Sequence, residues 1–279
     1  GAKVTVLEAG GWDKSPFIHM PAGYFRLMQT LQLDWGYWTV PQKHVNNRTM
    51  LVPRANSVGG CTTVTGMIYT RGHRTDYDHW SQLGNRGWDY ESVLPYFKKA
   101  ESWGGGGDMS IHGTDGPLKT SRAPITSPIS KAWIDGSLQA GYPYNDDLNA
   151  GEQEGTGPCD GTLADGIRSS VSRCYITPVR DRKNLTVLTK VLVSKIILKN
   201  GRAVGVEYLE GRQVKKLYAN QEVILCGGAF NSPHVLQLSG IGDPDHLRRI
   251  GVRVEHDLKG VGQNLQDHVG AGLKVRLTQ

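Results

Sequence analysis

Apolar and polar residues alternate between Leu185 and Leu225, in the runs TVLTKVLVSKIIL, AVGVEYL, VKKLYA and EVILC. Alternation with a period of two is typical of strands that bury one face. Asn200-Gly201 separates the first two runs, and this dipeptide is a strong signal for a two-residue hairpin turn. The pattern therefore predicts an antiparallel meander that returns to a buried strand at Val223–Cys226.

A short apolar run, Val4–Leu7, contains β-branched residues and ends at Glu8, before a glycine pair. This predicts a buried parallel strand followed by a loop. In dinucleotide-binding folds an acidic residue at such a strand end binds the ribose hydroxyls, about 20 residues after a GxGxxG turn. We expect that turn, together with the first strand and the first helix, to precede Gly1. The alternative for Glu8 is an ordinary exposed acid at a strand end.

A second strand–turn–helix passage is predicted after Val223–Cys226. Gly227-Gly228-Ala229 supplies the turn, and the helix is expected to begin near Ser232-Pro233, because proline suits the first helical turn. Two further helices are predicted, one behind the N-cap residue Asp89 and the other over Ile129–Ala140.

Pro53–Trp80 carries the densest candidate chemistry. Gly59-Gly60 is followed by small hydroxyl and thiol residues and then by Gly66. Paired glycines allow positive φ and let a ligand approach the backbone. Successive N–H groups and short hydroxyl side chains bind anions. The stretch therefore predicts a loop that grips a flat or phosphorylated ligand, and the alternative is a tight turn of small residues. By contrast, Trp12–Arg48 is predicted to be irregular and is rich in aromatic residues.

Composition limits the classes of function. Of the 279 residues, 38% are hydrophobic and 21% are charged, which indicates a folded globular protein. The net charge of +6 raises the hypothesis of nucleic-acid binding, but basic residues occur only in short patches, so we expect no nucleic-acid partner. No apolar run approaches the roughly 20 residues of a transmembrane segment. The four cysteines suggest neither a metal site nor a disulfide scaffold, which favours a reducing, cytoplasmic location.

Several stretches resemble, in order, the motifs of one family. Pro53–Trp80 resembles the first signature of the glucose–methanol–choline (GMC) flavin oxidoreductases, and Gly228–Gly242 matches the second. Glu8 in VTVLEAG, the run Gly166–Thr189 and the run Gly260–His268 also follow the order of that family. The resemblance covers essentially the whole chain. HMPAGYFRLM, DWGYWTVPQ and YTRGHRTDYDHW look most like the choline, sorbose and primary-alcohol dehydrogenases within it.

The resemblance implies an α/β fold: an FAD-binding, Rossmann-like domain with an antiparallel meander, plus part of an α+β substrate or lid domain. It assigns residues 1–74 and 184–279 to the discontinuous FAD-binding domain and 75–183 to the lid and substrate side. It also implies the oxidation of an alcohol to a carbonyl compound, with hydride transfer to the flavin. The electron acceptor would be oxygen, or a quinone or dye. Alternatives are a non-catalytic fragment and a hydroxynitrile lyase of the same fold.

The resemblance also implies roles for single residues. Glu8 would hold the adenosine ribose, Trp35 would stack at the adenine end or belong to the core, and Val193 would contact adenine through its backbone. The pyrophosphate, ribityl chain and flavin edge would be wrapped by Gly59, Gly60, Thr65, Gly66 and Met67. The catalytic histidine of the family would lie beyond Gln279, so His268 is expected to close a polar loop instead.

The sequence departs from the family pattern in the flavin loop. Cys61 stands where Gly, Ser or Thr is usual, and Thr65 stands where Asn or His is usual. Ala55-Asn56 replaces the usual Gly-Arg or Gly-Lys pair. Val64 stands where some members attach the flavin covalently through a histidine. Because valine cannot form that bond, FAD is expected to be non-covalent.

Overall fold

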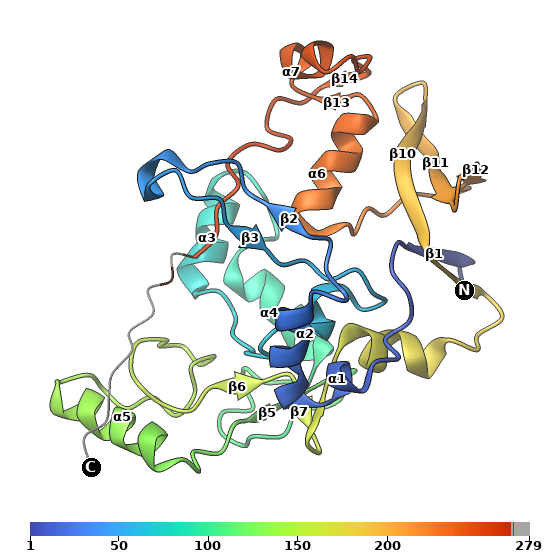
Figure 1. Ribbon diagram of the computed structural model, residues 1–279. Helices are drawn as coiled ribbons and strands as arrows, with labels where there is room; N and C mark the ends of the chain where they lie inside the picture. Colours follow the sequence, from blue (N-terminus) through green and yellow to red (C-terminus); the bar gives the residue numbers. More distant parts are fainter. Residues whose placement is uncertain (269, 271–279) are drawn as a thin grey trace. The chain divides into compact units, whose positions relative to one another are not determined.

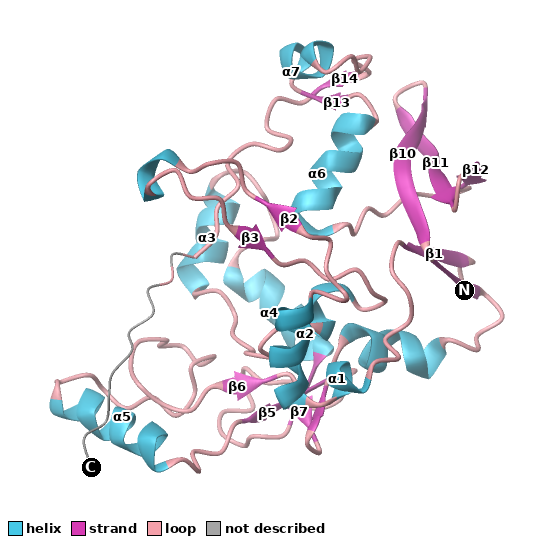
Figure 2. Cartoon of the chain, in the orientation of Figure 1, coloured by secondary structure: helices cyan, strands magenta, loops and turns pink. Residues whose placement is uncertain are grey.

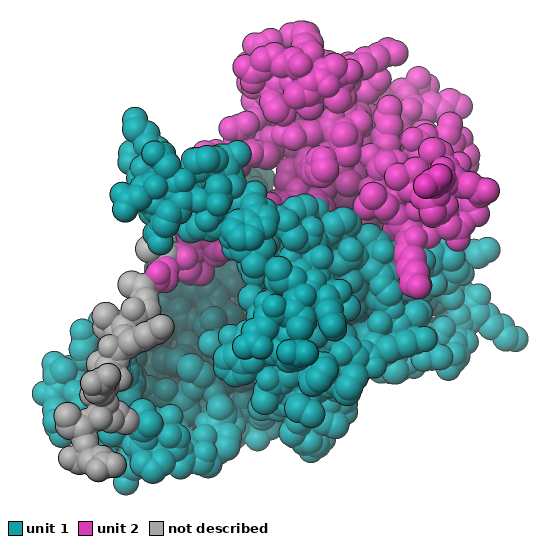
Figure 3. Space-filling view, viewed as in Figure 1, with its two compact units in different colours: residues 1–189 teal, residues 190–279 magenta. Residues whose placement is uncertain are grey.

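A computed structural model describes residues 1–268 and residue 270 (Figures 1 and 2). The chain divides into two compact units, Gly1–Thr189 and Lys190–Gln279 (Figure 3), and each is described by itself. The predicted grouping of residues 1–74 with 184–279 stays a prediction. Within the described residues, no helix combines the length and the apolar character needed to cross a bilayer.

Strand β1 (Val4–Glu8) of the first unit pairs in parallel with β9 (Leu185–Thr189), with Val4 opposite Leu185 and Glu8 opposite Thr189. This confirms the parallel strand predicted at Val4–Leu7, but the strand is not buried as expected, because Val4 is exposed and the other residues are only partly buried. The other strands of this unit are short and form β2 (Tyr37–Trp38) with β3 (Leu51–Val52), β4 (Glu101–Trp103) with β5 (Leu118–Arg122) and β6 (Asp160–Gly161), and β7 (Leu163–Ala164) with β8 (Ile167–Arg168).

Trp12–Arg48, predicted to be irregular, contains two short helices, α1 (Pro16–His19) and α2 (Tyr24–Thr30). The prediction missed these helices, which are too short to show a clear periodicity, whereas most of the remaining segment is irregular as expected. Ile18 and Leu27, one from each helix, pack in a buried cluster with Ala55 and Val64. The candidate ligand loop is therefore anchored on these helices by its apolar side chains.

Three longer helices follow in the first unit, α3 (Arg74–Gln82), α4 (Tyr90–Ala100) and α5 (Pro128–Gln139). The predicted cap of α4 is confirmed, because the Asp89 carboxylate accepts the Ser92 N–H at 3.0 Å. The helix predicted at Ile129–Ala140 is also confirmed. The unit contains further single turns, at Pro21–Gly23, Lys43–Val45, Gly60–Thr63, Ser172–Ile176 and Thr177–Val179.

A buried ionic network centred on His112 includes Glu101, the first residue of β4. The Nδ1 and Nε2 atoms of His112 lie 3.0 Å from carboxylate oxygens of Glu101 and Asp147, respectively. The His112 ring also stacks on Trp103, with ring centres 4.3 Å apart. Arg71 completes the network, donating to Glu101 at 2.9 Å. Because both ring nitrogens face carboxylates, only the imidazolium form of His112 can donate to both.

In the second unit, β10 (Val191–Lys199), β11 (Arg202–Glu210) and β12 (Gln213–Tyr218) form an antiparallel meander. Asn200 and Gly201 have φ of +53° and +75°, and Lys199 pairs with Arg202 around them. The predicted two-residue hairpin is therefore confirmed. The first apolar run is nevertheless not one strand, because Lys190, at φ +61°, separates β9 from β10.

The strand predicted at Val223–Cys226 is wrong. None of these residues is in a strand, and the Ile224 side chain is 74% exposed. A strand needs a neighbour for its backbone hydrogen bonds, and no described strand pairs with this segment. Helix α6 (Gly228–Leu238) also begins earlier than predicted, so Pro233 lies beyond its first turn. The unit is completed by β13 (Ile241–Gly242), α7 (Pro244–Arg249) and β14 (His256–Asp257).

The His112 network predicts that stability falls as the pH rises. Burial lowers the pKa of His112, but the hydrogen bonds and charges of Glu101 and Asp147 outweigh burial and raise it above 6.5. The stabilising contribution is therefore fully present below about pH 6.5 and is lost as the pH rises through the raised pKa. Urea unfolding between about pH 6 and about pH 9 should show this loss.

In His112→Asn the slope should be flatter and the protein less stable by about 3 kcal/mol, because Glu101 and Asp147 lose their cation. His79→Asn, on the exposed surface of α3, is the control and should keep the wild-type slope. An unchanged pH slope in His112→Asn would contradict this assignment.

Candidate functional site

The paired glycines open a tight turn in the candidate ligand loop. Gly59 and Gly60 have φ of +99° and +55°, a region that favours glycine. The Thr62 hydroxyl donates to the Gly59 carbonyl at 2.6 Å, and the Thr63 hydroxyl donates to the Gly60 carbonyl at 2.8 Å. The threonine hydroxyls that follow the glycines therefore stabilise the turn by hydrogen bonds to its own carbonyl groups.

The end of β1 lies against this turn. Gly11 forms a parallel bridge with Ser57, and the Val58 N–H donates to the Gly11 carbonyl at 2.9 Å. A Cβ at Gly10 would lie 2.2 Å from the carbonyl of Asn56, so only glycine permits this approach. The structure thus brings the strand that ends at Glu8 together with the segment leading to the glycine pair.

Glu8 sits at this junction with a partly buried carboxylate. Its Oε1 accepts the Gly10 N–H at 2.7 Å. Burial raises the pKa of Glu8 from its usual 4.5, although the N–H groups of Gly10 and Ala9 act in the opposite direction. A carboxylate held in this way can accept hydrogen bonds from a diol, which fits the expected contact with a ribose.

The loop turns an open face outward at Thr65 and Gly66, both of which are exposed. Apart from the adjoining residues, no atom of the described part of the chain lies within 4 Å of the position of a Cβ at Gly60 or Gly66. Met67 has φ of +65°, an unusual value for a residue other than glycine, and such strain clusters at ligand sites. These open glycine faces leave space for a flat ligand close to the backbone.

The opposite side of the loop is held by residues distant in sequence. Arg168 donates from Nη1 to the Thr65 carbonyl at 2.7 Å, and the Thr162 N–H donates to the Met67 carbonyl at 2.8 Å. The Val171 N–H donates to the Thr62 hydroxyl at 3.0 Å. Sequence reasoning missed Arg168 and Thr162 as parts of the site. The only signal was that GIRSSVSRCY belongs to a family-like run.

The two residues expected at the adenine end lie in different units. Trp35 is in the first unit, where its ring stacks on Tyr37 with ring centres 5.8 Å apart. Val193 is in the second unit, on β10 opposite Tyr208 and directly before a β-bulge. The roles of both residues stay predictions. His268 is exposed, and its N–H donates to Asp267.

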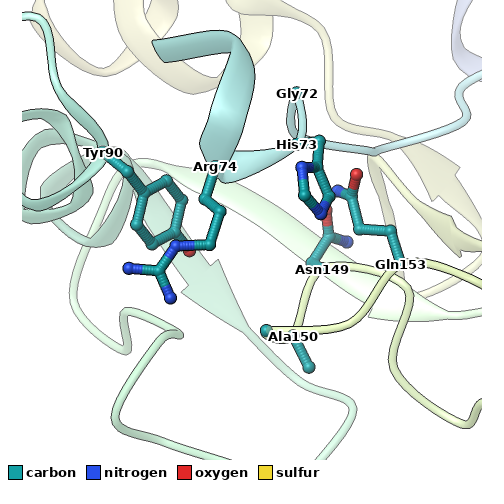
Figure 4. Close-up of a pocket in the computed structure, with 8 residues that line it drawn as sticks. Gly72, His73, Arg74, Tyr90, Asn149, Ala150 and Gln153 are labelled. Atoms are coloured by element: carbon teal, nitrogen blue, oxygen red, sulfur yellow. The ribbon is translucent and has the colours of Figure 1, made fainter. Parts of the chain in front are cut away.

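A separate small pocket lies between the start of α3 and the loop around Asn149 (Figure 4). Arg74 lies over the ring of Tyr90, and His73 contacts the Thr75 hydroxyl at 2.7 Å. The pocket has room for about one water molecule, so it is no substrate site. Within the described residues, no group of three or more His, Cys, Asp or Glu side chains could hold a metal ion.

A sequence model of the GMC oxidoreductases matches residues 6–270. An oxygen-dependent choline dehydrogenase from Sinorhizobium fredii is 44% identical over 266 residues, covering 95% of this chain and 48% of that protein. The chain thus spans about half the length of such relatives.

Solved structures agree with the sequence comparison. Pyridoxine 4-oxidase from Mesorbium loti has a TM-score of 0.90 and 34% identity, covering 95% of this chain and 52% of that one. An FAD-dependent oxidoreductase from Chaetomium thermophilum has a TM-score of 0.89 and 36% identity, covering 95% and 48%. These similarities confirm the predicted α/β fold class.

The environment of the glycine pair predicts that two neighbouring alanine substitutions will differ in cost. A Cβ at Gly59 would lie 3.0 Å from Ser172 and Thr63, whereas the space at Gly60 is open. Gly60→Ala should lower the free energy of unfolding by about 1 kcal/mol, because alanine is strained at positive φ. Gly59→Ala should lower it by roughly 1–3 kcal/mol more, because the added Cβ overpacks the turn. Urea unfolding of both variants checks this order, and equal losses of stability would show that Ser172 and Thr63 do not confine the turn.

Proposed function

Because the chain belongs to the GMC oxidoreductase family, we propose that it forms the FAD-binding part of an oxidoreductase that converts an alcohol to a carbonyl compound. The observation that carries this proposal is the junction of β1 with the glycine turn. There the partly buried carboxylate of Glu8 and the open faces of Gly60 and Gly66 belong to one unit. A dinucleotide needs both features, an acceptor for its ribose diol and a backbone that it can approach closely.

Different residues of the chain contact different parts of the cofactor. Glu8 accepts from the adenosine ribose, and Gly59, Gly60, Thr65, Gly66 and Met67 line the pyrophosphate, ribityl chain and flavin edge. Trp35 and the backbone of Val193 serve the adenine end. When bound, FAD supplies a hydride acceptor for the alcohol carbon. The protein residues hold and orient the cofactor, and either oxygen or a quinone or dye receives the electrons.

We propose that FAD is bound without a covalent link to Val64. The Val64 side chain has no nucleophile, and it is only 9% exposed. It packs with Ile18, Leu27 and Ala55 in the apolar cluster that anchors the loop.

Two further expectations from the sequence are kept as proposals. Residues 75–183 form the lid and substrate side, and the protein is cytoplasmic. The four cysteines are free, which favours a reducing compartment.

The absorption spectrum of the purified protein, with its intact mass, tests cofactor binding. Oxidised-flavin bands that separate from the protein on denaturation support non-covalent FAD. A colourless protein would overturn FAD binding by this chain and leave the alternative of a non-catalytic fragment. Alcohols are then tested with oxygen and with a dye acceptor. Cyanohydrin cleavage without flavin reduction would favour the lyase alternative instead.

Glu8→Gln tests the assignment of the ribose contact. The variant keeps the size of the side chain but removes a charged acceptor, so FAD should bind about tenfold more weakly. FAD titration of the stripped proteins measures the change. Glu154→Gln, at an exposed loop position, is the matched control and should bind FAD like the wild type. Equal affinities for wild type and Glu8→Gln would remove Glu8 from the site.

A further inference from the structure

Arg168, at the end of β8, is a fully buried positive charge, with 0% of its surface exposed. Within the described residues it forms no ion pair, and its Nη2 atom has no hydrogen-bond partner. Burial lowers the pKa of Arg168. Arginine nevertheless stays protonated in proteins, so the charge is present inside the first unit.

Such burial is unfavourable unless the charge is compensated. Taking an ion out of water without a counter-ion costs several kcal/mol. Arg71 shows the usual solution in the same unit, because its guanidinium is buried but donates to the Glu101 carboxylate at 2.9 Å. Arg168 differs, because every acceptor that it contacts is a backbone carbonyl. Its burial therefore calls for an explanation other than a salt bridge.

The three carbonyls come from two separate segments. Arg168 donates from Nε to Ile18 at 2.8 Å, and from Nη1 to Thr65 at 2.7 Å and to Thr62 at 3.2 Å. Ile18 belongs to the apolar cluster, whereas Thr62 and Thr65 flank the buried residues Thr63 and Val64 of the loop. A planar guanidinium has five donors in a fixed fork, so it can fix the spacing of several acceptors at once.

These bonds determine which side of the loop faces outward. The carbonyls of Thr62 and Thr65 point inward to Arg168, and the Met67 carbonyl is bonded to Thr162. These carbonyls are bonded on the inner side of the loop, and Thr65 and Gly66 are exposed on its outer side. This is the surface that the proposed function assigns to the flavin edge.

We propose that Arg168 is the positioning residue of the flavin loop, fixing the backbone of residues 62–67 in the orientation that receives the cofactor. The proposal rests on the proposed function for the identity of the ligand. It does not rest on it for the loop itself, because the hydrogen bonds that hold the loop involve protein atoms alone.

The test compares Arg168→Lys with Arg71→Lys, which is the same substitution at another buried arginine of the same unit. Lysine has no fork and cannot bridge the three carbonyls, whereas at position 71 it can still pair with Glu101. The first readout is hydrogen exchange of the loop amides without FAD. Arg168→Lys should raise exchange at residues 62–67 about tenfold, and Arg71→Lys should not.

The second readout uses FAD-loaded protein. The two variants are compared at temperatures the same distance below their own melting temperatures. Arg168→Lys should release FAD about tenfold faster than the wild type and alter the visible circular dichroism of the flavin. Arg71→Lys should leave both properties unchanged. If Arg168→Lys does not fold, Arg168→Gln replaces it with the same expectations, because its neutral amide can still donate to one carbonyl.

The outcomes separate the two proposals. Equal exchange and equal FAD release in the Arg168 and Arg71 variants would overturn the positioning role while the proposed function stands. A wild-type protein that takes up no FAD would overturn the proposed function. In that case the exchange experiment still decides whether Arg168 fixes the loop.

Discussion

Backbone N–H and C=O groups that lie outside helices and strands need other hydrogen-bond partners when they are buried. The structure of the first unit depends on which groups supply these partners. Its strands are short, so side chains from distant segments supply the partners. The Asp34 carboxylate accepts the Arg54 N–H at 2.9 Å, and the Asn149 amide accepts the Arg71 N–H at 2.7 Å. Arg168 does the same for carbonyls. Asn149 and Arg168 are themselves buried, so the irregular segments that they bond are held from inside the unit.

The same unit buries guanidinium groups in two electrostatic settings. Arg71 joins Glu101, His112 and Asp147 in a network where opposite charges balance. Hydrogen bonds from His112 and Gly113 and the charge of Arg71 lower the pKa of Glu101 below 4.5, although burial alone would raise it. Arg168 has only carbonyl dipoles around it. The first setting therefore responds to pH, whereas the second depends on the geometry of the backbone.

Local signals in the sequence were reliable where the physics is local. The Asn200-Gly201 turn and the Asp89 cap each depend on a few neighbouring residues, and both are present. Val223–Cys226 failed because a strand requires a partner that its own sequence does not specify. Arg168 was missed because its acceptors lie 103 to 150 residues away along the chain. The strand that ends at Glu8 and the glycine pair could be located from sequence, whereas the residues that hold them could not.

The pairing of β1 with β9 has a consequence for how the protein is made. Val4 donates its N–H to the carbonyl of Asn184, so the first strand gains its partner only after that residue has left the ribosome. At roughly 5–20 residues per second, the interval lasts on the order of ten seconds or more. During that time the apolar residues of β1 can bind chaperones or neighbouring nascent chains. The same holds for the glycine loop, because Arg168 and Val171, which bond it, are also made late. The order of synthesis thus leaves β1 without this partner strand until nearly all of the first unit has been made.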